Sequence, residues 1–76
     1  MYYIRSCTYC SKVFYTYQDR KEDAAKVLYE GLKKHLTEWG EDHKEYELDE
    51  APEIEIDQMY YEVIESEEEP ASAYEL

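Results

Sequence analysis

Two short stretches at the start of the chain have the composition of β-strands. Residues 1–6 and 12–17 are rich in Tyr, Ile, Val and Phe, and the turn-sized segment Cys-Thr-Tyr-Cys at residues 7–10 lies between them. Aromatic and β-branched residues favour strands, and a connection of this length suits two antiparallel neighbours. The pattern therefore predicts a β-hairpin.

One stripe of apolar positions predicts an amphipathic helix after the hairpin. The stripe repeats at spacings of three and four residues, and its members are Ala25, Leu28, Leu32, His35, Leu36 and Trp39. Asp19, with Glu22 three residues later, is typical of a helix start, and Gly40 stands where a terminating glycine is expected. We therefore predict a helix over about residues 20–39, with its stripe against Ile4 and Phe14 of the sheet.

The pattern weakens in the second half of the chain. Tyr46 and Leu48 alternate with acids, as in a short edge strand, and residues 49–52 have the composition of a turn. Residues 54–64 are rich in Ile, Tyr, Met and Val, which predicts a further strand.

These elements predict a single small domain of the α+β class. We expect a ββαβ(β) arrangement over residues 1–64, in which an antiparallel sheet carries one amphipathic helix on one face. Residues 65–76 begin with Glu-Ser-Glu-Glu-Glu-Pro and are expected to form an acidic C-terminal tail.

Charge separates the two halves of this 76-residue chain, whose net charge is −12. Residues 1–40 hold five acids and seven bases, whereas residues 41–76 hold fifteen acids and one base. This balance disfavours direct binding to nucleic acid or to an anionic membrane. No apolar stretch is long enough to span a bilayer, and the N-terminal stretch lacks the apolar core of a signal peptide. We therefore expect a cytoplasmic protein, and its small size argues against an enzyme; its oligomeric state stays open.

The spacing Cys7-x2-Cys10 at the predicted turn, followed by Phe14, resembles the first half of a two-cysteine, two-histidine zinc finger. The resemblance covers residues 2–43 at most. In that family a knuckle at the hairpin tip presents two thiolates, and a Phe packs under the helix. The resemblance implies that Cys7 and Cys10 are metal ligands.

The predicted geometry brings a histidine to the same end of the molecule. A strand over residues 11–17 spans about 23 Å, and fifteen helical residues returning alongside it also cover about 23 Å. His35 therefore lies level with the two cysteines. Tetrahedral zinc needs a fourth ligand, which His43 supplies if the chain turns back after Gly40.

The ligand spacing departs from that of the zinc-finger family. The 24 residues between Cys10 and His35 exceed the usual interval, and seven residues separate His35 from His43. Glu38 and Asp42 are weaker candidates for the fourth ligand. One structural zinc is therefore one interpretation, and a pair of reduced, partly buried cysteines beside a core histidine is the other. A cytoplasmic location disfavours a disulfide between the cysteines.

In size and composition the chain is similar to the small acidic phage DNA-mimic inhibitors, which include anti-restriction, anti-CRISPR and uracil-DNA-glycosylase-inhibiting proteins. The similarity is one of type, without a shared motif. It implies an inhibitor in the cytoplasm of a phage host that occupies a basic, nucleic-acid-binding surface of a target protein. The alternative is a zinc-finger-like adaptor for protein–protein contacts, with an acidic half that keeps it soluble.

The second half of the chain supplies the candidate binding residues. Acids fixed on a rigid element lose less entropy on binding than acids on a tail, and Tyr is a frequent interface anchor. The candidates on and around the predicted strand are Glu53, Glu55, Asp57, Tyr60, Tyr61, Glu62 and Glu65.

Overall fold

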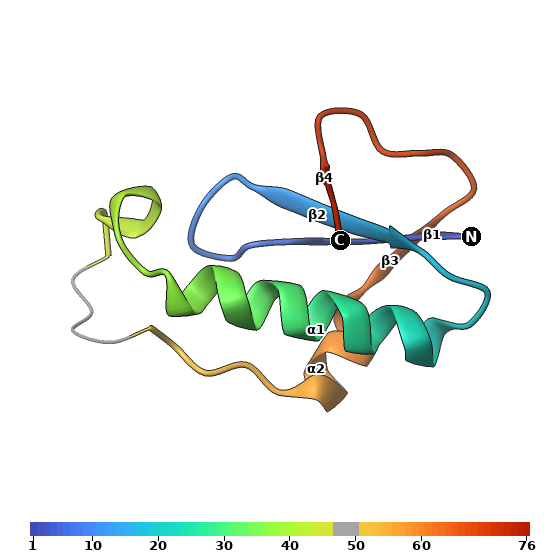
Figure 1. The fold of residues 1–76 in the computed structure, drawn as a ribbon, viewed down its shortest axis with the longest axis horizontal. Helices are drawn as coiled ribbons and strands as arrows, with labels where there is room; N and C mark the ends of the chain where they lie inside the picture. Colours follow the sequence, from blue (N-terminus) through green and yellow to red (C-terminus); the bar gives the residue numbers. More distant parts are fainter. Residues whose placement is uncertain (47–50) are drawn as a thin grey trace.

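The computed structural model places a four-stranded sheet beside two helices (Figure 1). It describes residues 1–46 and 51–76, so the predicted edge strand at Leu48 lies outside the described residues. In chain order the elements are β1 (Tyr2–Ser6), β2 (Val13–Tyr17), α1 (Lys21–Thr37), the 3-10 helix η1 (Glu41–His43), α2 (Ile56–Glu62), β3 (Ile64–Ser66) and β4 (Tyr74–Glu75).

The predicted hairpin is confirmed, because β1 pairs antiparallel with β2 and Ile4 lies opposite Tyr15. β3 pairs antiparallel with β1 on its other side, whereas β4 runs parallel to β2. The order across the sheet is β3-β1-β2-β4. The expected α+β class is confirmed, and the sheet is mixed rather than purely antiparallel because of β4.

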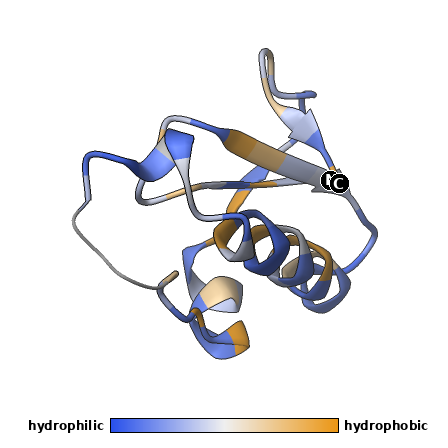
Figure 2. Ribbon diagram, turned by 60° about the vertical axis from the view of Figure 1, so that its left-hand side comes forward, coloured by the Kyte–Doolittle hydropathy of each residue, from blue (hydrophilic) through white to orange (hydrophobic). Residues whose placement is uncertain are grey.

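The predicted helix is confirmed as α1, which spans Lys21–Thr37. Its buried side chains are Ala24, Ala25, Leu28, Leu32 and Leu36. Figure 2 shows that the hydrophobic positions of α1 gather on the side toward the sheet and α2. The expected cap at Asp19 is wrong, because Arg20 is the N-cap residue and its side chain forms no capping hydrogen bond. Acidic Glu22 in the first turn still suits the positive end of the helix dipole.

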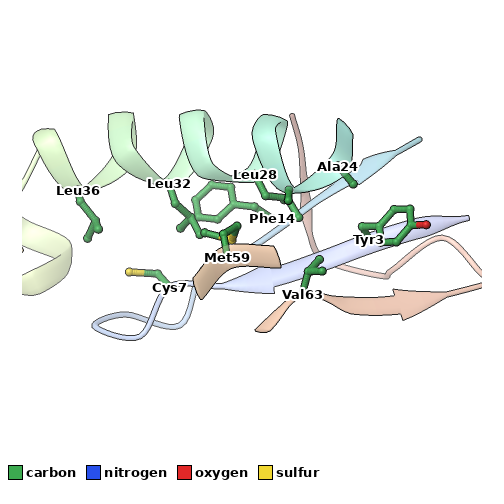
Figure 3. Close-up of a cluster of buried hydrophobic side chains, with 10 residues drawn as sticks. Tyr3, Cys7, Phe14, Ala24, Leu28, Leu32, Leu36, Met59 and Val63 are labelled. Carbon is green, nitrogen blue, oxygen red and sulfur yellow. The ribbon is translucent and has the colours of Figure 1, made fainter. Parts of the chain in front are cut away.

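The core lies between the sheet and the two helices. Figure 3 shows Phe14 beside Leu28 and Leu32, with Met59 of α2 in the same cluster. Ile4 was expected to join this core and does not. Side chains alternate along a strand, so β1 turns Tyr3 toward the core and places Ile4 on the opposite face with its partner Tyr15.

The strand predicted over residues 54–64 is wrong, because most of this stretch forms α2. Met59 and Val63 are both buried and stand four residues apart, which is a helical spacing. Val63 is extended and ends the helix, and β3 begins at the next residue. Among the described residues no helix is both long and apolar enough to cross a bilayer.

Part of the segment predicted as an acidic tail lies against the sheet. β4 pairs with β2, and the Leu76 N–H donates a hydrogen bond to the Tyr15 carbonyl at 2.9 Å. The Leu76 side chain packs against Gly31 of α1, where any side chain on residue 31 would collide with it. The Tyr15 hydroxyl donates to a Glu69 carboxylate oxygen at 2.8 Å. Helix, sheet and C-terminal segment are thus joined by side-chain contacts.

Replacing the centre of the α1 stripe tests this packing. Leu32 is 4% exposed, so Leu32→Ala is expected to lower the free energy of unfolding by about 2–5 kcal/mol. Glu30→Ala, at an exposed position of the same helix, should leave it nearly unchanged. Urea denaturation followed by circular dichroism measures both. Equal midpoints for Leu32→Ala and the unmodified chain would contradict the assigned core.

The contact between Tyr15 and Glu69 predicts a pH effect. The hydrogen bond to Glu69, together with burial, raises the pKa of Tyr15 from 10.0 to about 12. The stabilisation linked to this shift is therefore complete below pH 10 and lost as the pH rises toward 12. Carbon-13 NMR of the Tyr15 ring should show this late titration, and Glu69→Gln should move it toward 10, whereas Glu68→Gln should not. A Tyr15 that titrates at 10 in the unmodified chain would refute the contact.

Candidate metal centre

Four metal-binding side chains meet at one end of the molecule. Cys7 and Cys10 come from the connection between β1 and β2, His35 from the last turn of α1, and His43 from η1. Figure 1 shows the hairpin connection, the C-terminal end of α1 and η1 together at this end. The four ligand atoms all lie within 4.8 Å of one another. These are the four residues that the sequence predicts as ligands.

The hairpin connection holds the two cysteines. The Cys7 N–H donates to the Lys12 carbonyl at 2.9 Å, which closes the turn. Burial raises the pKa of the Cys7 thiol, and backbone hydrogen bonds from Tyr9 and Cys10 oppose that rise. Metals bind the thiolate, so these two backbone hydrogen bonds offset part of the cost that burial imposes on the metal-binding form. Both cysteines are free thiols.

The helix positions His35 beside Cys10. The Cys10 Sγ and His35 Nε2 atoms are 3.3 Å apart. The ring of Phe14 packs at 5.2 Å from the His35 ring, which agrees with the supporting role that the zinc-finger resemblance implies for this Phe. The predicted match in length between strand and helix is confirmed by this contact.

The chain turns back after Gly40 and delivers His43. The His43 N–H donates to the Gly40 carbonyl at 2.8 Å, within η1. The His43 side chain is 1% exposed, and its Nε2 atom lies 3.4 Å from the Cys7 Sγ atom. Its Nδ1 atom has no hydrogen-bond partner among the described residues. The sequence-based condition for a fourth ligand is therefore met, whereas the Asp42 side chain is outside the described part.

An aromatic cluster fixes this turn. The Trp39 ring stacks on the His43 ring with centroids 4.2 Å apart and planes at 6°. Tyr9 contacts both Trp39 and Tyr46 through edge-to-face packing. The sequence placed Trp39 on the helix stripe, and its stacking on His43 was missed. The sequence signal for this cluster is Tyr9, an aromatic residue inside the Cys7-x2-Cys10 segment and therefore close to two predicted ligands.

The donor set fits zinc. Tetrahedral zinc with bonds of about 2.3 Å to sulfur and about 2.0–2.1 Å to nitrogen places neighbouring S and N atoms roughly 3.6 Å apart. The two observed S···N distances, 3.3 and 3.4 Å, are close to that value. Two thiolates and two imidazoles also form a complete set, which is typical of a structural rather than a catalytic site. The four side chains are a potential tetrahedral site for one structural zinc.

The predicted binding acids lie around α2. Glu53 and Glu55 precede the helix and Asp57 is in its first turn, all exposed. Glu62, at the end of α2, pairs with Arg5 at 2.6 Å, and Glu65 lies 3.8 Å from Lys21. Two of these acids are therefore partly neutralised within the domain.

The two tyrosines among the predicted binding residues, Tyr60 and Tyr61, differ in how exposed they are. Tyr60 is half-buried and packs against the core, and the Lys21 ammonium lies 4.8 Å from its ring centre. Tyr61 is 80% exposed and contacts the Tyr60 ring edge-to-face. Only Tyr61 is therefore fully available to a partner.

No protein-family model, curated protein or solved structure matches the chain. The resemblance in type to DNA-mimic inhibitors gains no support from these comparisons. The zinc-finger resemblance is supported by the clustered ligands and by the packing of Phe14 on His35. β3, β4 and α2 extend the domain beyond a single finger.

Removing one ligand tests the metal centre. The protein purified without chelator should carry a single zinc ion. His43→Ala should lose it and melt about 10 °C or more below the unmodified chain, because each kcal/mol shifts a domain of this size by about 4–8 °C. Lys44→Ala, at the exposed neighbouring position, should keep both the zinc and the melting temperature.

Elemental analysis and thermal denaturation with and without chelator measure this effect. Trace zinc in the unmodified protein, with folding indifferent to chelator, would exclude a structural metal.

Proposed function

We propose that this chain is a small zinc-stabilised binding domain that contacts a basic surface of a partner protein. The observation that carries the proposal is the convergence of Cys7, Cys10, His35 and His43. A complete ligand set leaves no open coordination position for chemistry. The metal then serves to hold a binding surface, and the reduced thiols suit a compartment such as the cytoplasm.

The size of the domain explains why it would need a metal. A chain of this length buries only about 60% of its unfolded surface, and small domains often depend on a metal or on disulfides. The ligands join the hairpin, the end of α1 and η1. Metal binding would therefore stabilise the end of the domain where the short η1 contributes little core.

The charge supports a basic partner. Among the predicted binding acids, Glu53, Glu55 and Asp57 are exposed and take part in no ion pair within the described part of the chain. The negative electrostatic field of such unpaired acids speeds the encounter with a positively charged surface. Nucleic-acid-binding surfaces are basic because they contact phosphates through Lys and Arg, so such a surface would fit this field.

Two types of protein fit this description. The ligand cluster favours a zinc-finger-like adaptor that joins two proteins. An inhibitor of the DNA-mimic type is the second candidate, and the pairing of β3 and β4 with the hairpin favours it, because acids next to ordered strands form a fixed array. The two differ in whether DNA competes for the same partner surface.

A capture experiment separates the two candidates. The immobilised, zinc-loaded chain is incubated with a lysate of the source cell at low salt, and bound proteins are eluted with duplex DNA and then with salt. Elution of a nucleic-acid-binding protein by DNA would identify a mimic. Retention through DNA and release by salt would identify an adaptor with a basic partner. A partner that neither DNA nor salt elutes would contradict the proposal.

Reversing the unpaired acids tests the electrostatic part of the proposal. Glu53→Lys, Glu55→Lys and Asp57→Lys together should slow association with the captured partner at least about tenfold at low salt, with little change in dissociation. Glu62 is left unchanged because its reversal would repel Arg5. Reversal of Glu30, Glu38 and Glu45, which are exposed and form no ion pair within the described part of the chain, is the matched control. Surface plasmon resonance measures both rates, and equal association rates for both triple variants would mean that net charge, not this surface, matters.

A further inference from the structure

The face of the sheet opposite α1 carries a row of apolar and aromatic side chains. Cross-strand partners share a face, so Ile64, Ile4, Tyr15 and Glu75 form one row across all four strands. Ser66, Tyr2 and Tyr17 form the neighbouring row. We name the group Tyr2, Ile4, Tyr17 and Ile64 the outer patch.

Much of the outer patch is open to solvent. Ile64 is 63% exposed and Tyr17 is 58% exposed, whereas Tyr2 and Ile4 are half-buried between their neighbours. The Tyr2 ring contacts the Tyr17 ring edge-to-face at 4.9 Å, and the Tyr15 ring at 6.0 Å. These contacts hold the aromatic rings in place. An ordered, partly exposed aromatic group is the usual form of an interface anchor.

The charges around the outer patch are carboxylates. Glu67 and Glu68 follow β3 directly, and the Ser66 hydroxyl donates to the Glu68 carbonyl at 2.9 Å, which fixes this turn beside the patch. Glu75 ends the first row, and Glu69 accepts a hydrogen bond from the Tyr15 hydroxyl. None of the strand positions on this face is a lysine or arginine. Glu67, Glu68 and Glu75 form no ion pair within the described part of the chain.

This combination of aromatic rings and carboxylates favours the binding of arginine side chains. A guanidinium group stacks on aromatic rings and binds carboxylates through two parallel hydrogen bonds. The domain itself already places cations over tyrosine rings, with Lys21 above Tyr60 and Lys33 above Tyr29. Tyr2 and Tyr17 hold no such cation among the described residues.

We propose that the outer patch is the anchor site for an arginine-rich segment of the partner protein. This inference rests on the proposed function and names the surface that makes the contact. Arginine side chains stack on Tyr2 and Tyr17, the aliphatic parts of the segment cover Ile4 and Ile64, and Glu67 and Glu68 bind the guanidinium groups. The acids near α2 speed the encounter, and the outer patch sets the lifetime of the complex.

The α2 surface is the competing location. It carries Tyr61, which is more exposed than any residue of the outer patch, but its only ring contact among the described residues is with Tyr60. α2 packs beside α1, and Glu62 bonds to Arg5 on the helix side of the sheet. The outer patch and the α2 acids therefore face different directions, and variants can separate them.

The test uses two fluorescent peptides of equal length, one alternating arginine and glycine and the other alternating lysine and glycine, with the full zinc-loaded chain. The arginine peptide should bind more tightly than the lysine peptide. Tyr17→Thr combined with Ile64→Thr should speed dissociation of the arginine peptide about tenfold, since two exposed contacts are lost. Tyr61→Ala tests the competing α2 surface, and the proposal predicts unchanged dissociation for this variant. Thr keeps the strand preference, and zinc content verifies folding.

A second pair of variants tests the role of the carboxylates. Glu67→Gln with Glu68→Gln should weaken binding of the arginine peptide by about threefold or more, and more than Glu53→Gln with Glu55→Gln, which removes the same charge. If the outer-patch variants bind normally and Tyr61→Ala does not, the anchor lies on α2 and only this inference fails. If neither peptide binds the unmodified chain at low salt, both this inference and the proposed function fail.

Discussion

The convergence of two thiols and two imidazoles is the interaction on which the rest of this structure depends. The apolar core joins α1, α2 and the strands, and Trp39 in the turn after α1 packs against its edge. That turn is held by the contact between His43 and Cys7 and by the stacking of Trp39 on His43. A single metal ion would join the hairpin to both ends of this turn.

Stability and binding can then occupy separate parts of the molecule. The ligands stand at one end, whereas the exposed acids lie on and around α2, β3 and β4, and the outer patch lies on β1, β2 and β3. A small domain with a high net charge repels itself, and the compact state must offset that repulsion. Metal binding stabilises the folded state without requiring additional apolar residues on the surface. The surface can therefore stay acidic.

Local pattern predicted the hairpin, α1 and all four clustered side chains, because each depends on short-range periodicity or on element length. The stretch around Met59 was misassigned, because residues 54–64 are rich in Tyr and Ile and so have the composition of a strand, although residues 56–62 form a helix. The parallel pairing of β4 depends on contacts between Leu76, Tyr15 and Gly31, which are distant in sequence. Predicting that Ile4 faces away from the core requires the register of the sheet, because a shift of one residue exchanges the two faces.

X-ray absorption at the zinc edge is the most direct test of the central claim that these four residues hold a metal. The account predicts a first shell of two sulfur atoms at about 2.3 Å and two nitrogen atoms at about 2.0–2.1 Å, with imidazole scattering from two rings. Replacing Cys10 with Ser should remove one sulfur from that shell. A first shell of oxygen and nitrogen only, or a shell unchanged by the Cys10→Ser substitution, would contradict the account.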